Sequence, residues 1–381
     1  MAAGVDDAER EARMMMSRLA EPGDADACHL VHEHSALALL ERLRTHRGRS
    51  SKLADWSERL RTANLRAICD GASSVGARYV CPGDPEWPVR LDDLALVDES
   101  SADRRGGEPF GLWVRGSGHL ADICDRSVAI VGARAATAYG EHVAGDLAAE
   151  CGERGYTVVS GGAYGIDAAA HRGALAVGRP SVAALAGGID KPYPSGNIRL
   201  IERLTTTGVI VAEAAPGCTP TRSRFLVRNR LIAALSLGVV VVEAALRSGS
   251  LNTARWARDL NRSVLGVPGP VTSSASAGVH ELLRQPETVL VTDAGEVVEQ
   301  LSPVGTAPAA VKSGEISPRD LLDARSQRVL DAVPVYNAAS ARSIAATAGL
   351  RLADVEQRLD QLGERGLATT DGRGWRLTLT D

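Results

Sequence analysis

Aromatic side chains are scarce in this sequence, at 3% of 381 residues with only two phenylalanines. Proteins that hold nucleic-acid bases mainly by stacking need a series of exposed rings. The scarcity therefore disfavours a stacking platform and favours contacts to phosphates and backbone. Long apolar runs are also missing, since none approaches the roughly 20 residues that a helix needs to cross a bilayer. We therefore expect a soluble protein.

Cysteines are few and irregularly spaced, without a Cys-x-x-Cys pair and without a secretory leader before them. Such thiols are expected to be reduced and buried, as in cytoplasmic proteins. The segment Cys28–His34 places one cysteine and three histidines close enough to catch a metal ion, but no second ligand cluster completes a site. We therefore expect a cytoplasmic protein without a metal. The cysteines are Cys28, Cys69, Cys81, Cys124, Cys151 and Cys218.

A large excess of positive charge is absent as well, because the formal net charge is -4. Binding to an anion must then be local, through a patch. Such a patch stands at Thr221–Arg230 (TRSRFLVRNR), where four arginines crowd the start of an apolar helix. Unpaired N–H groups and partial positive charge at a helix N-terminus, with guanidinium groups added, favour phosphate. The alternative interpretation is a solvated basic turn.

Short apolar runs alternate with helical patterns through the middle of the chain. Each run is followed by glycine, small polar residues or proline and then by a helical pattern, which is typical of βα units around a buried parallel sheet. The predicted fold class is therefore α/β, a Rossmann-like doubly wound parallel sheet. The predicted strands are Val128–Val131, Thr157–Ser160, Ser181–Leu185, Val209–Ala212, Val239–Glu243 and Val264–Val267.

The segments that follow these strands are rich in glycine, serine and arginine. Ligands of such sheets bind at the carboxyl ends of the strands, and this composition suits a phosphate groove lined by backbone. Arg247 and the SGS sequence after it predict an anion-binding nest in one of these segments. The segments are Gly132–Thr137, Ser160–Asp167, Gly187–Pro194, Glu243–Ala254 and Pro268–Pro270.

Six motifs between about Pro85 and Thr292 together resemble the bacterial DNA-processing proteins called DprA or Smf. They are GARAATAYG from Gly132, SGGAYGIDAAAH from Ser160, YP at Tyr193, FLVRNR from Phe225, VEAALRSGSLNTA from Val242 and PG at Pro268. The resemblance implies a non-enzymatic protein without cofactor. Such a protein binds single-stranded DNA, helps to load the RecA recombinase in natural transformation, and forms a homodimer. One departure is Tyr164, where the family often carries arginine; a tyrosine there is able to stack on a base.

The resemblance and the anion-site pattern together give a set of expected DNA-binding residues. Arg134 contacts phosphate by resemblance, with a salt bridge to a neighbouring loop as the alternative. Phe225 either supports a base or fills the core. Arg228 and Arg230 point in different directions around a helix, so we expect one of them to face DNA and the other Glu243. The full set is Gly132, Arg134, Ser160, Gly161, Gly162, Tyr164, Arg222, Phe225, Arg228, Asn229, Arg230, Arg247, Ser248, Gly249, Ser250 and Thr253.

Enzymatic alternatives are weaker. The GARAAT loop lacks the second and third glycines of a dinucleotide fingerprint, so NAD and FAD are not expected. Asp167 and His171, one helical turn apart, suit a helix cap and a packed histidine better than a triad with Ser160. The leading competitor is a nucleotide hydrolase similar to the lysine-decarboxylase-like phosphoribohydrolases. Those enzymes carry a PGGxGTxxE loop, whereas SGSLNTARWA here lacks the glutamate.

The chain is expected to have four parts. The resemblance implies a helical, SAM-like N-terminal region over 1–75 and the Rossmann-like domain over 76–302. A flexible linker spans 303–317. Residues 318–381 read as three helices and a hairpin and resemble the winged helix that some family members carry. The third predicted helix of that last domain, Leu352–Gly366, carries four acidic residues against Arg358 and Arg365. A helix that reads the major groove is expected to be basic. We therefore expect this domain to contact protein or regulate rather than read DNA.

Overall fold

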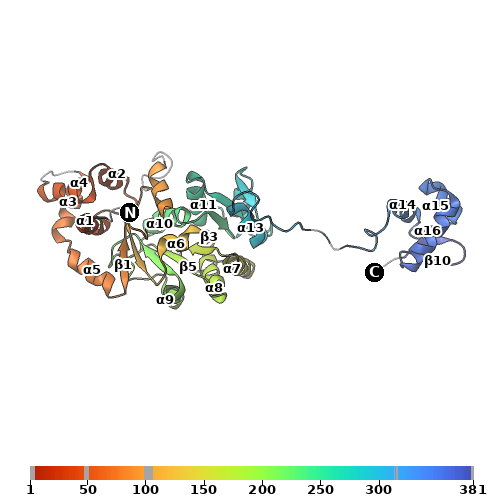
Figure 1. Cartoon of the computed structure of the whole chain (residues 1–381), viewed down its shortest axis with the longest axis horizontal. Coiled ribbons are helices and arrows are strands. Elements are labelled where there is room, and N and C mark those ends of the chain that lie inside the picture. The colour runs from red at the N-terminus through yellow and green to blue at the C-terminus, as the bar shows by residue number, and fades with distance from the viewer. Residues whose placement is uncertain (1–4, 47–50, 98–105, 313, 315, 379–381) are drawn as a thin grey trace. The chain divides into compact units, whose positions relative to one another are not determined.

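The computed structural model describes residues 5–46, 51–97, 106–312, 314 and 316–378. The chain forms two compact units, Met1–Ala309 and Ala310–Asp381 (Figure 1). The finer division into four parts stays a prediction. The expected linker, 303–317, includes the last residues of the first unit and the first residues of the second. Two of its residues, Ser313 and Glu315, lie outside the described residues.

Unit 1 is built on a nine-stranded sheet in the order β1-β2-β6-β5-β4-β3-β7-β8-β9. The strands from β6 to β9 in that order are parallel, whereas β2 pairs antiparallel with β6 and with β1. This confirms the doubly wound α/β class, with an antiparallel extension at one edge. The strands are β1 Ala77–Val80, β2 Leu112–Arg115, β3 Ser127–Val131, β4 Thr157–Ser160, β5 Ser181–Leu185, β6 Val209–Ala212, β7 Gly238–Val241, β8 Ser263–Gly266 and β9 Thr288–Leu290.

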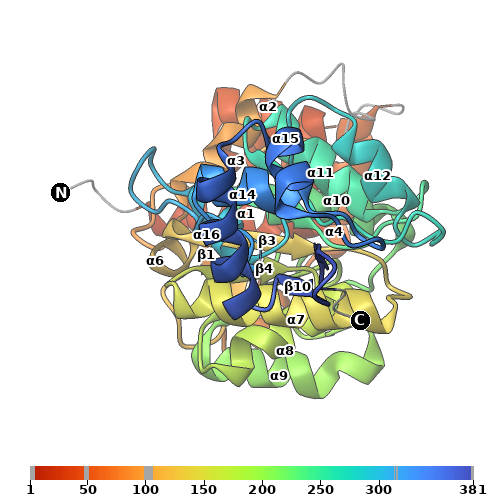
Figure 2. The same ribbon diagram turned by 90° about the vertical axis from the view of Figure 1, so that its right-hand side faces the viewer.

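Alternate residues of each central strand enter different cores, because successive side chains point to opposite faces of a sheet. In β6, Val209 and Val211 join one core while Ile210 and Ala212 join another. Helices η1, α6, α10, α11 and α12 lie on the first face, and α7, α8, α9 and α13 cover the second. Figures 1 and 2 show helices of both layers. These helices are η1 Val89–Leu96, α6 Leu120–Asp125, α7 Ala138–Glu153, α8 Ile166–Ala176, α9 Ile198–Thr207, α10 Arg222–Ala234, α11 Ser250–Asp259, α12 Ala277–Leu283 and α13 Ala294–Leu301.

Five N-terminal helices share a core with the sheet. Met16 and Leu19 of the first helix are fully buried in the same cluster as Trp113 and Ile210 of the sheet. The Trp113 Nε1 donates to Ser17 Oγ at 3.3 Å. The expected helical region is therefore observed, and it belongs to unit 1. The helices are α1 Asp7–Leu19, α2 Ala25–His34, α3 Ala36–Thr45, α4 Lys52–Thr62 and α5 Leu65–Ser73.

Unit 2 has three helices and a hairpin, as the sequence predicts. Ser340 caps α15 by accepting from the Ser343 N–H at 3.3 Å, and Gly349 ends it with a left-handed φ of 65°. The winged-helix assignment itself stays a prediction. The elements, seen in Figure 2, are α14 Ala324–Ala332, α15 Ala341–Ala348, α16 Leu352–Glu364, β10 Ala368–Thr370 and β11 Trp375–Leu377.

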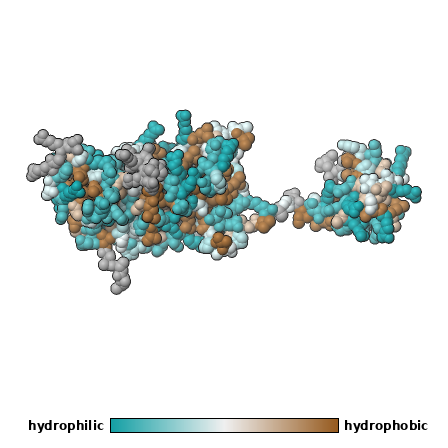
Figure 3. Space-filling model, turned by 90° about the horizontal axis from the view of Figure 1, so that it is seen from above, coloured by the Kyte–Doolittle hydropathy of each residue, from teal (hydrophilic) through white to brown (hydrophobic). Residues whose placement is uncertain are grey.

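The surface of both units mixes residue types. Hydrophilic and hydrophobic residues are interspersed over the face that Figure 3 shows. No helix among the described residues is long and apolar enough to cross a membrane. All six cysteines are free; four are buried as expected, whereas Cys28 and Cys69 are half-buried.

Candidate functional site

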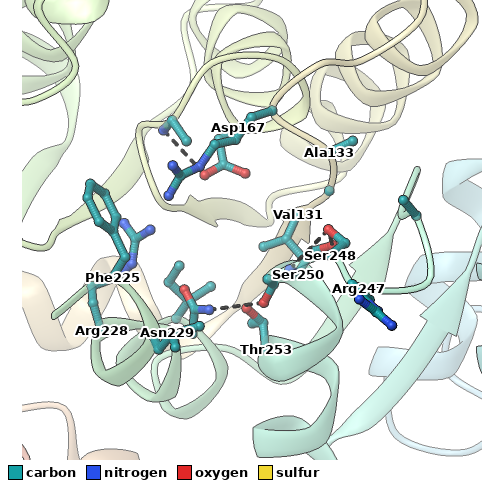
Figure 4. Close-up of a pocket in the computed structure, with 17 residues that line it drawn as sticks. Val131, Ala133, Asp167, Phe225, Arg228, Asn229, Arg247, Ser248, Ser250 and Thr253 are labelled. Atoms are coloured by element: carbon teal, nitrogen blue, oxygen red, sulfur yellow. Dashed lines mark hydrogen bonds between the residues drawn. The ribbon is translucent and has the colours of Figure 1, made fainter. Parts of the chain in front are cut away.

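A cleft of about 380 Å³ opens at the carboxyl ends of β3, β4 and β7 (Figure 4). The strand order changes direction between β3 and β7, and this switch point is where doubly wound sheets hold ligands. The loop after β3 contributes Gly132–Arg134, and the segment after β7 contributes Arg247–Ser250. Helix α10 closes the remaining side. The cleft thus joins three of the five segments that the sequence pattern selected, whereas Gly187–Pro194 and Pro268–Pro270 supply no residue to its lining.

A second hollow of about 500 Å³ shares Arg134, Phe225 and Arg247 with this cleft. It adds Tyr193 and the start of α10, including Arg222. Because the two spaces share these residues, they form one extended groove. We call it the main groove.

Helix α10 begins where the sequence predicts an anion site. Thr221 is its N-cap, and its hydroxyl accepts from the Arg224 N–H at 3.3 Å. The partial positive charge of this helix end lies beside the exposed Arg222. The helix therefore presents both a dipole and a guanidinium at the groove.

Three exposed arginines line the main groove from three different elements: Arg134, Arg222 and Arg247. Within the described part of the chain, none of them forms an ion pair. The Arg134 guanidinium lies 4.6 Å from the centroid of the Phe225 ring, a cation–π arrangement, instead of the alternative salt bridge. The Tyr193 ring lies 5.8 Å from Phe225. Positive charge and two aromatic rings thus share the same surface.

The start of α11 forms a small polar nest. The Ser248 and Ser250 hydroxyl oxygens lie 2.8 Å apart, and the Asn229 Nδ2 donates to the Gly249 carbonyl at 3.1 Å. The N-cap of α11 is Gly249, which has no side chain to accept from the N–H groups of the first turn. The positive end of the α11 dipole therefore faces the cleft beside two hydroxyl groups. Thr253 is buried in the wall behind them.

Buried charges form the floor of the cleft. Arg228 is 6% exposed, and its Nη1 donates to the Gly161 carbonyl at 2.5 Å and to the Ala184 carbonyl. Burial lowers the pKa of Arg228 to about 10, so it stays charged at neutral pH. Burial also raises the pKa of Asp167, while the charge of Arg228 opposes that rise. The Asp167 carboxylate accepts from the Ala163 N–H at 3.3 Å and ties the loop to α8.

Gly161 is required for this floor. A Cβ at Gly161 would lie 2.5 Å from Arg228 Nη2 and 2.6 Å from Asp167 Oδ2. The close approach of the guanidinium to the loop therefore depends on a residue without a side chain.

Some expected residues lie away from the groove. Arg230 is fully buried and pairs with Glu213 at 2.6 Å, so the expectations that it contacts DNA or faces Glu243 are wrong. The Glu243 carboxylate instead accepts two hydrogen bonds from Thr137. The Thr137 N–H donates at 2.9 Å and the Thr137 hydroxyl at 2.6 Å. Ser160 is also buried and donates to the Ile130 carbonyl at 2.7 Å.

Two further residues of the expected loop stay outside the cleft lining. Gly162 is buried behind it with a φ of 70°, and its carbonyl accepts from Asn197. Tyr164 is 47% exposed, and its hydroxyl accepts from the Gly196 N–H at 3.2 Å. Contacts from these two positions to a ligand stay predictions.

The interpretation of His171 as a packed histidine fits the geometry, but the expectation that Asp167 caps the helix is wrong. Gly165 is the N-cap of α8, no side chain caps the helix, and Asp167 bonds the preceding loop instead. His171 is fully buried, its Nδ1 lies 2.7 Å from Ser181 Oγ, and burial lowers its pKa to about 3. Ser160, Asp167 and His171 each have other partners, as described above, and do not form a triad. Over the described residues, no group of three or more histidine, cysteine or acidic side chains is placed to hold a metal ion.

Sequence analysis missed Tyr193 and Leu226 as groove residues. Tyr193 belongs to the YP motif. Its loop follows the predicted strand Ser181–Leu185, and this position at the carboxyl end of a strand was a signal for a groove residue. Leu226 is 45% exposed at the groove, and only the helical phase of α10 would have indicated this.

Comparisons with known proteins identify similar sequences and folds. A family model described as DNA recombination-mediator protein A matches residues 78–302. A DNA processing protein DprA of Mycobacterium tuberculosis is 45% identical over 374 residues, which are 95% of this chain and 92% of that protein. Protein Smf of Escherichia coli is 41% identical over 225 residues, 58% of this chain and 56% of that protein.

Two solved structures are similar to this chain. That of DNA processing protein A from Streptococcus pneumoniae has a TM-score of 0.62 at 26% identity, over 78% of this chain and 99% of its own. That of DNA processing protein A from Helicobacter pylori has a TM-score of 0.51 at 27% identity, over 60% and 97% respectively. The Helicobacter pylori structure concerns the single-stranded DNA binding mode of that protein.

Proposed function

Because the chain belongs to the DNA recombination-mediator protein A family, we propose that it binds single-stranded DNA in the main groove and passes the strand to a RecA-type recombinase. One observation carries the location of the site. Three exposed arginines, without ion pairs to any described residue, converge with two helix N-termini at the switch point of the sheet. Phosphate contacts of this kind position a strand without reading its sequence.

The rings beside the arginines favour an unpaired strand. The Phe225 ring contacts both the Arg134 guanidinium and the Tyr193 ring. In a duplex the base faces are stacked on each other, whereas a single strand offers them to a protein ring. We therefore infer that the groove prefers single strands to duplexes and tolerates any base.

A direct test uses labelled oligonucleotides and nucleoside monophosphates with the purified protein. We expect a salt-sensitive complex with single strands, weaker binding to the matching duplex, and no release of base from the nucleotides. Base release would instead support the phosphoribohydrolase-like competitor. The acid in the cleft, Asp167, is buried and bonded to the Ala163 N–H, an arrangement that does not suit a general base.

Four finer parts of the proposal rest on family membership alone. They are transfer of the strand to RecA, a homodimer, a cytoplasmic location, and the lack of catalytic activity. The first is tested by the DNA-dependent ATPase of RecA on strands covered by a single-strand-binding protein. We expect the protein to shorten the lag before ATP hydrolysis, and an unchanged lag would contradict the transfer step. Sedimentation equilibrium measures the oligomeric state.

A further inference from the structure

A basic hollow of about 270 Å³ lies between the N-terminal helices and the start of α10. We call it the N-terminal notch. Three arginines and one glutamate line it together with two small residues, and the arginines come from α1, α4 and α10. The lining residues are Arg18, Glu21, Arg59, Thr62, Ala63 and Arg224.

The charges in the notch do not balance. Glu21 pairs with Arg224 at 2.9 Å and 3.1 Å, which leaves the charges of Arg18 and Arg59 in excess within the lining. Both of these arginines are exposed. An excess of guanidinium groups in a concave polar space favours an anion with several oxygens, such as a phosphate group.

Structural contacts occupy only a small part of these guanidinium groups. The Arg59 Nη1 donates to the Leu19 carbonyl at 2.7 Å, and the Arg18 Nη1 donates to Cys218 Sγ at 3.2 Å. A guanidinium carries five N–H donors. Most donors of both arginines are therefore available to a ligand, while the single contacts hold the side chains at the notch.

The notch and the main groove lie on either side of one short segment. Pro220, Thr221 and Arg222 line the main groove, and Arg224, two residues further along α10, lines the notch. The Arg224 Nη1 also donates to the Thr219 carbonyl at 2.9 Å, which fixes this segment between the two hollows. A strand that leaves the main groove over the start of α10 meets the notch next.

We propose that the N-terminal notch is a second phosphate-binding site, which holds the backbone of single-stranded DNA as it leaves the main groove. This inference rests on the proposed function of the main groove. It gives the N-terminal helices a part in DNA binding and makes the binding site longer than the main groove. Short oligonucleotides fill the main groove alone, and longer ones reach the notch.

The test measures affinity for thymidine homopolymers from about 5 to about 30 nucleotides, a range that brackets known single-strand site sizes. The variants are Arg18→Gln, Arg59→Gln and the double variant. Arg61→Gln is the matched control, because Arg61 is on the same helix as Arg59 and pairs with Glu58 at the surface outside the notch. We expect the double variant to bind the longest strands about tenfold more weakly, with a salt slope smaller by about 0.7 per lost phosphate contact. The shortest strands and the control should be unaffected.

The outcomes separate the alternatives. An unchanged affinity for the longest strands, or an equal loss at every length, would overturn the notch as a DNA site. Arg18→Gln is the variant least expected to disturb folding, because the only structural contact of the Arg18 side chain among the described residues is the one to the Cys218 thiol. Thermal melting of each variant checks that it is folded. If the notch binds only free phosphate, inorganic phosphate will raise the melting temperature of the unchanged protein and not that of the double variant. The affinity for long strands will then be the same in both proteins, which overturns the notch as a DNA site. Failure of the unchanged protein to bind any strand would overturn the proposed function itself.

Discussion

Arg134 and Arg228 line the same cleft but have different surroundings. Arg134 is exposed and rests on the Phe225 ring, so a ligand can reach its N–H groups. Arg228 is 6% exposed and donates to two carbonyl groups, that of Gly161 in the loop after β4 and that of Ala184 in β5. Replacing the first removes a contact to the ligand, whereas replacing the second removes part of the support of the site.

This difference is measurable at the residue scale. We expect Arg134→Gln to flatten the salt dependence of single-strand affinity by about 0.7, the value for one phosphate contact, without lowering the melting temperature. Arg228→Gln should lower the melting temperature, because it leaves buried carbonyl groups without a donor. Arg154→Gln, at an exposed i,i+4 pair with Glu150, is the control. A normal salt slope in Arg134→Gln would remove Arg134 from the DNA contacts.

His171 makes the stability of unit 1 depend on pH. Its folded pKa is about 3, far below the usual 6.5. Between these values the unfolded chain binds a proton that the folded chain does not, so stability falls as pH falls through this window. From pH 7 to pH 5 we expect a loss of about 2 kcal/mol from this group. Denaturant unfolding of the protein and of His171→Gln measures it, and an equal loss in both would contradict this origin.

At the scale of elements, α10 connects the groove to the rest of unit 1. Its first turn lines the main groove, while Arg230 near its middle pairs with Glu213 just after β6. Glu213 also accepts from the Gly23 N–H at 3.2 Å, in the turn after α1. The helix that presents Arg222 and Phe225 is thus anchored to the sheet and to the N-terminal helices through one buried carboxylate.

We expect Arg230→Met to destabilise the protein by about 3–5 kcal/mol, because it leaves Glu213 buried without its partner. The double variant Arg230→Met with Glu213→Gln should recover a large part of this loss, since the uncompensated charge is gone. Chemical unfolding of the two variants gives both numbers. A loss below about 1 kcal/mol in the single variant would mean that solvent reaches the carboxylate.

The strands that sequence analysis found and those that it missed differ in their place in the sheet. The six predicted strands lie within two residues of β3 to β8, because buried parallel strands are continuous apolar runs. β1 (ARYV) and β9 (TVL) are short edge strands with partly exposed residues, and their sequences carry no such signal. β2 (LWVR) is buried, but it is a short antiparallel strand outside the series of parallel βα units. For the candidate site, the motifs include three loops that line the cleft, but the direction of Arg230 depends on a carboxylate after a distant strand. Spacing along one helix does not contain that information.

At the scale of the whole molecule, the boundary of unit 1 lies beyond the predicted end of the Rossmann-like domain. Ala307 packs against the core under α7 and α13, and the Tyr156 hydroxyl lies 2.9 Å from Ser302 Oγ. The compact unit ends at Ala309. A truncation at Ser302 would therefore remove part of the unit, and one after Ala309 keeps it.

We expect a protein that ends at Ala309 to bind single strands within about threefold of the full chain. Residues 317–381 contain nine arginines and nine acidic residues, so their formal charges cancel. One of the acids, Asp381, lies outside the described part. Without a net charge, the segment has no long-range attraction for DNA. Several of these charges are already paired, as in Arg358 with Asp323 at 2.8 Å. Anisotropy titrations of both proteins, with melting curves to show folding, make the comparison. A hundredfold weaker complex would make unit 2 a principal DNA-binding element.

The hydrogen bonds beneath the main groove also have a thermodynamic consequence. Arg228 is fixed by two carbonyl groups and Asp167 by an N–H group, so the floor of the groove is already in place before a ligand arrives. In a preorganised site of this kind, the conformational entropy lost on binding comes mainly from the ligand. The apolar surface that a strand would cover comes mainly from two rings and Leu226, so the heat-capacity change on binding should be negative and modest. The intrinsic stiffness of the DNA strand, rather than any rearrangement of the protein, would then set differences in binding entropy between sequences.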